Sequence, residues 1–195
     1  MNILYIHGLS SSGNSSTATR LKELLPHDTI VSPDLPINPQ EALDMLLQLC
    51  KEEQIDLAIG TSMGGMFAQK LRGYQKILVN PAFHVSQSLR NKIGVNPFFS
   101  SRKDGATEFE ITPELCDLYE KLEKEQFKGL TQAELDITYA LFATNDNIVN
   151  CSEEYIQFYD NYYTFDGEHR LSLDNLKNDV IPLIEKIRDN LDNQS

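Results

Sequence analysis

The segment that most constrains the fold of this chain is residues 56–68, where a serine stands between closely spaced glycines. An apolar stretch of strand length ends at Gly60, Ser62 follows two residues later, and Gly64 leads into residues that suit a helix. The pattern G-x-S-x-G at a strand-to-helix turn is typical of a nucleophile elbow, in which small residues make room for neighbouring backbone. Such a turn lifts the serine hydroxyl above the sheet. It also points the backbone N–H of Met63, at the start of the helix, toward the same space.

The same residues also fit a simple turn between a strand and a helix, in which Ser62 only caps the helix. The pentapeptide alone does not separate the two interpretations, because glycine and serine are common in loops. The apolar strand before it and the helix after it favour the nucleophile.

A second informative break follows the first apolar run, Asn2–Ile6, which predicts a buried strand at the start of the chain. Gly8 lets the chain turn sharply after this strand, so that the next amide faces the nucleophile. We therefore expect the backbone N–H of Leu9 to join that of Met63 as an oxyanion donor, with the N–H of Ser10 as the alternative. A small-residue loop without this role also fits the pattern.

A histidine and a carboxylate that would activate Ser62 come later in the chain, each directly after a predicted strand. A strongly apolar strand runs into the loop that carries Asp146, and His169 follows the last predicted strand, 162–165. The order serine, aspartate, histidine is the one expected of a Ser-His-Asp triad on a fold with this elbow.

Five other titratable residues lie near the ends of predicted strands. Asp34 and His84 each follow a strand. Turn and cap uses of aspartate are far commoner than catalytic ones, and we expect His84 to line the pocket at most. His7 precedes the serine and lies on a different strand, so we expect it to hold its loop by hydrogen bonds. Asp166 and Glu168 are rival acids, although a carboxylate so close in sequence rarely folds back onto the histidine ring.

Strands and helices alternate strictly over the first part of the chain, as far as the break at Asn80–Ala82. Such alternation predicts an α/β fold, a mostly parallel sheet of about six strands with helices on both faces. The expected strands are 2–6, 29–31, 55–59, 76–79, 137–143 and 162–165, and the main expected helices are 16–25, 39–53, 66–73 and 173–191.

The alternation lapses over residues 84–136. We expect a loop around 96–101 and then an amphipathic helix that begins at Thr112 and Pro113, a favourable N-cap and first-turn pair. This segment precedes the strand that leads to Asp146. We interpret it as a small helical insertion, cap-like in position, that walls or covers the site within one α/β domain spanning 1–195. A solvent-facing connector that only buries its leucines fits equally well.

Charge and length limit the classes of partner. The chain has 195 residues, 17 of them Lys or Arg and 29 Asp or Glu, for a net charge of −12. This charge repels phosphate backbones and anionic lipid, so we expect no nucleic-acid or membrane partner and a small-molecule substrate. It also predicts slow turnover of polyanionic substrates. The sequence carries no signal for the oligomeric state.

The N-terminus and the cysteines indicate the compartment. Met1 leads directly into the first strand with no basic segment, long apolar stretch or cleavage site, so we expect a cytoplasmic protein. Cys50, Cys116 and Cys151 lie far apart without C-x-x-C spacing, which predicts small core fillers and neither disulfides nor a thiolate metal site.

With these residues placed, the chain resembles the α/β-hydrolase superfamily and, within it, the short YqiA-like esterases. The narrower resemblance rests on the H-G-x-x-S-S opening at His7–Ser12 and on N-P-A at Asn80–Ala82. It covers nearly the whole chain in order. The resemblance implies cleavage of carboxylic esters, usually with small acyl groups, by a triad carried onto Ser62, His169 and Asp146.

The chain departs from the family pattern at four positions: Thr61 and Met63 beside the serine, Ala143 before the acid loop, and Arg170 after the histidine. None of these changes removes a reacting group. These four changes leave the identity of the substrate undetermined, whereas the implied reaction class is unaffected.

We therefore expect a serine esterase that works through an acyl-enzyme. His169 would take the proton of Ser62, Asp146 would orient the imidazole, and the N–H groups of Met63 and Leu9 would hold the oxyanion. No metal or organic cofactor is implied. A thioesterase or an amidase would use the same residues, and a non-catalytic binding module that kept the fold is the alternative of a different class.

Overall fold

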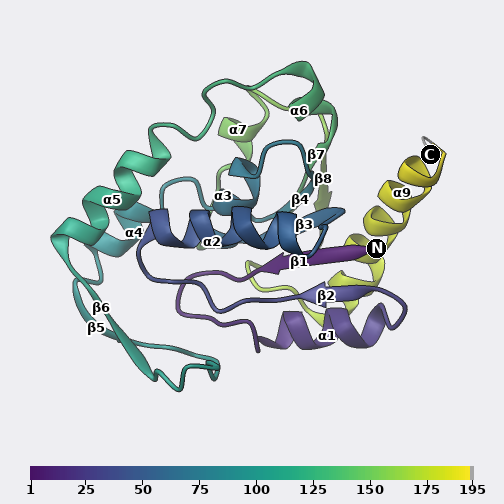
Figure 1. The fold of residues 1–195 in the computed structure, drawn as a ribbon. Helices are drawn as coiled ribbons and strands as arrows, with labels where there is room; N and C mark the ends of the chain where they lie inside the picture. Colours follow the sequence, from purple (N-terminus) through teal and green to yellow (C-terminus); the bar gives the residue numbers. More distant parts are fainter. Residues whose placement is uncertain (194–195) are drawn as a thin grey trace.

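The computed structural model describes residues 1–193, and its centre is a six-stranded sheet in the strand order β2-β1-β3-β4-β7-β8 (Figure 1). Every neighbouring pair of strands in this sheet is parallel. Its strands are β1 (Asn2–Ile6), β2 (Thr29–Val31), β3 (Leu57–Thr61), β4 (Gln75–Val79), β7 (Thr138–Ala143) and β8 (Tyr162–Phe165). The expected α/β class and sheet are confirmed.

Helices cover both faces of the sheet (Figure 1). They are α1 (Ser16–Leu24), α2 (Pro39–Glu52), α3 (Met63–Lys70), α4 (Val85–Arg90), α5 (Pro113–Glu123), α6 (Gln132–Asp136), α7 (Ser152–Tyr155), α8 (Leu173–Asn175) and α9 (Ile181–Asp192). Alternate residues of the strands point to opposite faces, and this divides the core into two apolar clusters. Ile3 and Tyr5 of β1 pack with α1 and α9, whereas Leu4 and Ile6 pack with α2 and α3.

The last helix differs from the continuous helix expected over 173–191. Between α8 and α9 the chain forms a π-helical turn, Leu176–Val180. Pro182, in the first turn of α9, has no N–H to donate to the carbonyl four residues earlier. A wider turn just before the proline accommodates that missing bond, which the apolar periodicity of the segment does not reveal.

The insertion before β7 contains more β-structure than expected. Strand β5 (Gly94–Pro97) pairs antiparallel with β6 (Glu108–Ile111), where a loop was expected around 96–101. The hairpin extends away from the large sheet, below α4 and α5 in the view of Figure 1. Helix α5 begins where expected, because the hydroxyl of Thr112 accepts a hydrogen bond from the N–H of Leu115 at 3.2 Å.

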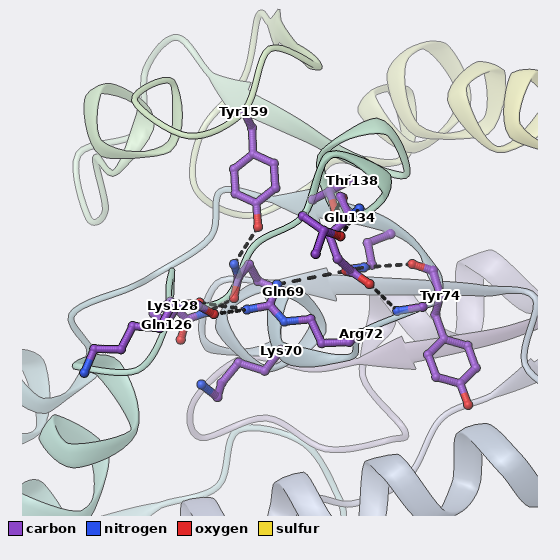
Figure 2. Close-up of polar contacts among 12 residues, drawn as sticks. Gln69, Lys70, Arg72, Tyr74, Gln126, Lys128, Glu134, Thr138 and Tyr159 are labelled. Carbon is purple, nitrogen blue, oxygen red and sulfur yellow. Dashed lines mark hydrogen bonds and ion pairs between the residues drawn. The ribbon is translucent and has the colours of Figure 1, made fainter.

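A buried polar cluster lies at the amino-terminal edge of the sheet (Figure 2). The side chain of Lys76 in β4 is 0 % exposed, and its Nζ donates to Glu134 Oε2 at 2.9 Å and to the carbonyl of Tyr74 at 2.8 Å. Glu134 also accepts from the N–H of Gly73. This pair holds α6 to β4 at the edge opposite to the carboxyl ends of the strands.

A second branch of the cluster joins α3 to the end of the insertion (Figure 2). Gln69 in α3 donates to the hydroxyl of Tyr159, and Gln126 donates to Gln69 Oε1 at 2.8 Å. Arg72 donates to the carbonyl of Gln126 at 3.3 Å. The segment between α5 and α6 is therefore held to the helix that follows Ser62.

Two further sequence expectations can be compared with the structure. Cys50, Cys116 and Cys151 are buried, as expected of core fillers, and their thiols form no disulfide within residues 1–193. Over residues 1–193, every helix is too short or too polar to span a lipid bilayer.

Candidate active site

The parallel sheet brings loops that are distant in sequence to one edge. Ser62 follows β3, Asp146 lies in the loop after β7, and His169 lies in the loop after β8. The carboxyl ends of parallel strands meet at the same edge, where ligands bind in open α/β sheets. Three candidate residues spread over more than half of the chain therefore meet in space.

The side chains of these residues form a continuous row of hydrogen bonds. His169 Nε2 lies 3.0 Å from Ser62 Oγ, and His169 Nδ1 lies 2.7 Å from Asp146 Oδ2. The histidine and aspartate side chains are 13 % and 6 % exposed. The other carboxylate oxygen of Asp146 accepts from the N–H groups of Ile148 and Val149, at 2.8 and 2.9 Å. Both ends of the carboxylate are thus fixed.

The rival acids lie elsewhere. Asp166 accepts a hydrogen bond from the side chain of Asn145 at 3.1 Å. In the described part of the chain, neither its carboxylate nor that of Glu168 is hydrogen-bonded to the imidazole of His169. The only carboxylate on that ring within residues 1–193 is that of Asp146.

Ser62 stands on a strained turn. Its φ of 55° and ψ of −121° place a non-glycine residue at positive φ, and its side chain makes no capping bond to α3. The interpretation of Ser62 as a helix cap is therefore wrong. A Cβ on Gly60 would overlap the carbonyl of Gly64, and a Cβ on Gly64 would overlap the carbonyl of Ile6. Both positions need glycine because α3 passes very close to β1 and β3.

The loop after β1 lies directly against the serine. A Cβ built on Gly8 would lie 3.2 Å from Ser62 Cβ and 3.8 Å from Ser62 Oγ, which places the following residue, Leu9, beside the nucleophile. Met63 is the first residue of α3, so its N–H has no acceptor within the helix. Across residues 1–193, no acceptor is found for the N–H of Leu9 or of Met63.

Asp34 connects this loop to the insertion. Its Oδ1 accepts from the N–H of Gly13 at 2.8 Å, and its Oδ2 accepts from the N–H of Lys103 at 2.6 Å. The N–H of Phe99 also donates to the carbonyl of Ser10 at 2.7 Å, and Ser10 has a φ of 61°. Asp34 thus connects two loops. Its position between prolines indicated only a turn and gave no sign of this connection.

His7 holds the same loop from the other side. Its ring is 3 % exposed, and its Nδ1 lies 2.8 Å from the carbonyl of Gly8, while the N–H of Leu35 donates to its Nε2 at 3.1 Å. A carbonyl partner requires a proton on Nδ1, and an N–H partner requires none on Nε2, so the ring is neutral. Burial lowers the pKa of His7 to about 4. The expected structural role is confirmed.

His84 takes no part in this site. Its Nε2 lies 2.7 Å from a carboxylate oxygen of Glu154, and its side chain is 49 % exposed. Among residues 1–193, no group of three His, Cys, Asp or Glu side chains is arranged to hold a metal ion.

A small cavity borders the elbow through Leu9 and Met63. It has a volume of about 10 Å³, which is room for about one water molecule. Its walls are largely apolar and include Leu35, Phe98, Phe109, Leu115 and Tyr119. Four of these, all except Leu35, come from the insertion, so the insertion forms much of the wall of this cavity beside the elbow.

The geometry determines what the row of side chains can do. An imidazole at 3.0 Å from a serine hydroxyl can accept its proton, and a carboxylate on the other ring nitrogen holds Nε2 as the acceptor. The strained elbow places Ser62 against the loop after β1 and at the start of α3, where the N–H groups of Leu9 and Met63 have no acceptor within the described residues. Such an arrangement can activate a serine hydroxyl as a nucleophile.

Comparison with solved structures shows the fold. The chain is similar to Est1E from Butyrivibrio proteoclasticus, with a TM-score of 0.59 and 12 % identity over 95 % of this chain and 87 % of that one. It is also similar to α/β-hydrolase domain-containing protein 10 from mouse, with a TM-score of 0.58 and 14 % identity over 100 % of this chain and 90 % of that one. For the methylesterase MES16 from Arabidopsis, the TM-score is 0.58 and the identity 12 %, over 96 % of this chain and 98 % of that one. The expected α/β-hydrolase fold is confirmed.

Comparison with models of protein families gives a match over almost the whole chain. Residues 2–185 match the model of an uncharacterised protein family, UPF0227. The matched range includes the elbow, the loop after β1 and the loops that carry Asp146 and His169.

Proposed function

The chain belongs to the uncharacterised protein family UPF0227, and from the geometry of its site we propose that it is a serine hydrolase that cleaves carboxylic esters. The observation that carries the proposal is the row of contacts from Ser62 Oγ through His169 to Asp146, at 3.0 and 2.7 Å. We expect the substrate to carry a short acyl group, as the resemblance to the YqiA-like esterases implies.

In the first half of the proposed reaction, His169 Nε2 accepts the proton of Ser62 as Oγ attacks the carbonyl carbon of the ester. The oxygen of that carbonyl becomes negative and accepts from the N–H groups of Met63 and Leu9. Asp146 holds the imidazole and stabilises its cation. The imidazolium then gives the proton to the leaving alcohol, and an acyl-enzyme remains.

In the second half, a water molecule gives a proton to His169 Nε2 and attacks the acyl carbonyl. The same N–H groups donate to the second oxyanion, and the proton returns to Ser62 as the acid leaves. Each oxyanion donor contributes about 3 kcal/mol to lowering the barrier in enzymes of this type. The loop after β1, which supplies one of these donors, therefore contributes to the rate together with the triad.

The test is covalent labelling with a fluorophosphonate, followed by mapping of the modified peptide. We expect the adduct on Ser62, no labelling of Ser62→Ala, and unchanged labelling of Ser88→Ala, which alters an exposed serine of α4. A folded wild-type protein that stays unlabelled, or is labelled elsewhere, would favour a binding module that kept the fold.

The leaving group is tested separately. Rates on an ester, a thioester and an amide with the same short acyl group compare the proposed esterase with a thioesterase or amidase that uses the same residues. We expect the ester to react fastest. A higher kcat/KM on the thioester or the amide would reassign the substrate and leave the mechanism intact.

A further inference from the structure

The turn Asn80–Ala82, which follows β4, lies between the three loops that carry the proposed triad. Asn80 is 3 % exposed and has a φ of 44°, so a buried non-glycine residue adopts the left-handed region. Asparagine tolerates this conformation better than most side chains. The proposed reaction gives this residue no task, although the sequence pattern N-P-A marks it.

The side-chain amide of Asn80 joins the other two loops. Its Oδ1 accepts from the N–H of Ala143 at 2.7 Å, at the end of β7 and just before the loop of Asp146. Its Nδ2 donates to the carbonyl of His169 at 3.1 Å and to that of Glu168 at 3.3 Å. Carbonyls only accept and N–H groups only donate, so these three partners fix the orientation of the amide.

The rest of the turn contacts the elbow. The N–H of Ala82 donates to the carbonyl of Ser62 at 3.0 Å, and the N–H of Ser62 donates to the carbonyl of Val79 at 3.0 Å. Pro81 packs on α3, since a Cβ on Gly65 would lie 2.8 Å from Pro81 Cβ. One short turn thus contacts the segments of the serine, the acid and the base.

Resting on the proposed function, we propose that Asn80 is a positioning residue, which sets the backbone of His169 at the height where its ring reaches both Ser62 and Asp146. The ring can turn only about its two side-chain bonds. It meets two partners at 3.0 and 2.7 Å only if its backbone is held within a few tenths of an ångström. The bond at the carbonyl of His169 itself supplies that restraint.

Two substitutions isolate the amide. Asn80→Gly keeps the left-handed backbone and removes all three side-chain bonds. Asn80→Asp keeps the shape and the bond from Ala143, but a carboxylate cannot donate to the carbonyls of Glu168 and His169. Gln54→Gly is the matched control, because Gln54 is exposed, has a φ of 49° and lies before β3, at the opposite edge of the sheet from the triad.

Two readouts are needed. The first is the rate of fluorophosphonate labelling of Ser62 per folded molecule, with the folded fraction taken from circular dichroism. We expect a decrease on the order of 10²-fold for both Asn80 variants and none for Gln54→Gly. The second is the far-downfield proton NMR signal of His169 Nδ1–H, which should shift or disappear in both Asn80 variants.

The outcomes separate the inference from the proposed function. Wild-type labelling rates and an unchanged His169 signal in folded Asn80→Asp would overturn the positioning role, whether or not Asn80→Gly folds. If the wild-type protein is not labelled at Ser62, the proposed function fails. The NMR signal then still decides whether Asn80 holds the ring.

Discussion

Two polar clusters lie at opposite edges of the same sheet, one around Ser62 and His169 and one around Lys76 and Glu134. Both contain titratable groups that are largely removed from water. At the amino edge, burial lowers the pKa of Lys76, and the hydrogen bond from its ammonium to Glu134 opposes this shift. At the carboxyl edge the row of side chains ends at a half-buried hydroxyl.

The comparison teaches that a perturbed titratable group does not by itself indicate a functional site. Lys76 is 0 % exposed and is bonded to a carboxylate and a carbonyl, so it has no access to a substrate. The Ser62 hydroxyl lies beside a loop and a helix end whose N–H groups have no acceptor in residues 1–193. Substitutions at the carboxyl edge should therefore change activity at constant stability, and those at the amino edge should do the opposite.

The largest expected effect is that of Ser62→Ala. Loss of a nucleophile of this kind lowers kcat by about 10⁶-fold, or about 8 kcal/mol of barrier. The hydroxyl contributes no capping bond to α3, so we expect the melting temperature to stay within about 2 °C of wild type. Hydrolysis of a short-chain nitrophenyl ester and thermal unfolding measure the two quantities. A loss of stability together with activity would contradict the expected separation of the two properties between the two edges of the sheet.

Asp146→Asn should follow, with a decrease in kcat of about 10⁴-fold. An amide NH₂ can donate to His169 Nδ1 and so favours the tautomer that has its proton on Nε2, facing Ser62. Asp166→Asn is the matched control, because that carboxylate accepts only from Asn145 in the described contacts. A comparable loss in the control would mean that the acid has been misassigned.

Lys76→Met tests the other edge. It removes the nearer of the two cations beside the buried carboxylate of Glu134, because Arg72 lies 4.0 Å away, and breaking such a buried pair costs up to about 3–5 kcal/mol of unfolding free energy. We expect urea unfolding at a lower midpoint and fluorophosphonate labelling at the wild-type rate per folded molecule. The double variant with Glu134→Leu should recover part of the lost stability. Slower labelling of folded Lys76→Met would show that the two edges are coupled.

The smallest expected effect is a pH dependence carried by His7. Its pKa is about 4 in the folded chain and near 6.5 when unfolded, so between these values the unfolded state binds more protons. The free energy of unfolding should therefore fall as the pH is lowered from 6.5 to 4, by up to about 3 kcal/mol. His7→Gln, which does not titrate, should show a shallower dependence in urea titrations. Equal slopes for both proteins would refute this assignment.

Local patterns made the elbow and the overall topology predictable. The glycines around Ser62 are required because other backbone segments pass in direct contact with them. Their spacing can be read directly from the sequence. Strict alternation of strands and helices leaves few topologies for a parallel sheet. Since every strand then ends at one edge, the order of Ser62, Asp146 and His169 was enough to predict their meeting.

Partners that are distant along the chain were not predictable. Lys76 and Glu134 are 58 residues apart, and Asn80 reaches partners 63 and 89 residues away. A lysine in a strand or an asparagine in a turn carries no local sign of such partners. The hairpin β5–β6 was missed for another reason. The alternation of buried and exposed residues in Glu108–Ile111 covers only 4 residues, which is too short to indicate a strand from sequence.

The contacts between the insertion and its neighbouring loops leave freedom for divergence. Phe99 and Lys103 contribute backbone N–H groups to these contacts, and Ser101 contributes its carbonyl oxygen. Backbone groups persist whatever side chains the positions carry. Residues such as Phe109 and Leu115, whose side chains line the cavity, can therefore be exchanged during evolution without loosening the loop beside the nucleophile. The shape of the cavity can then change while the backbone contacts around it stay the same.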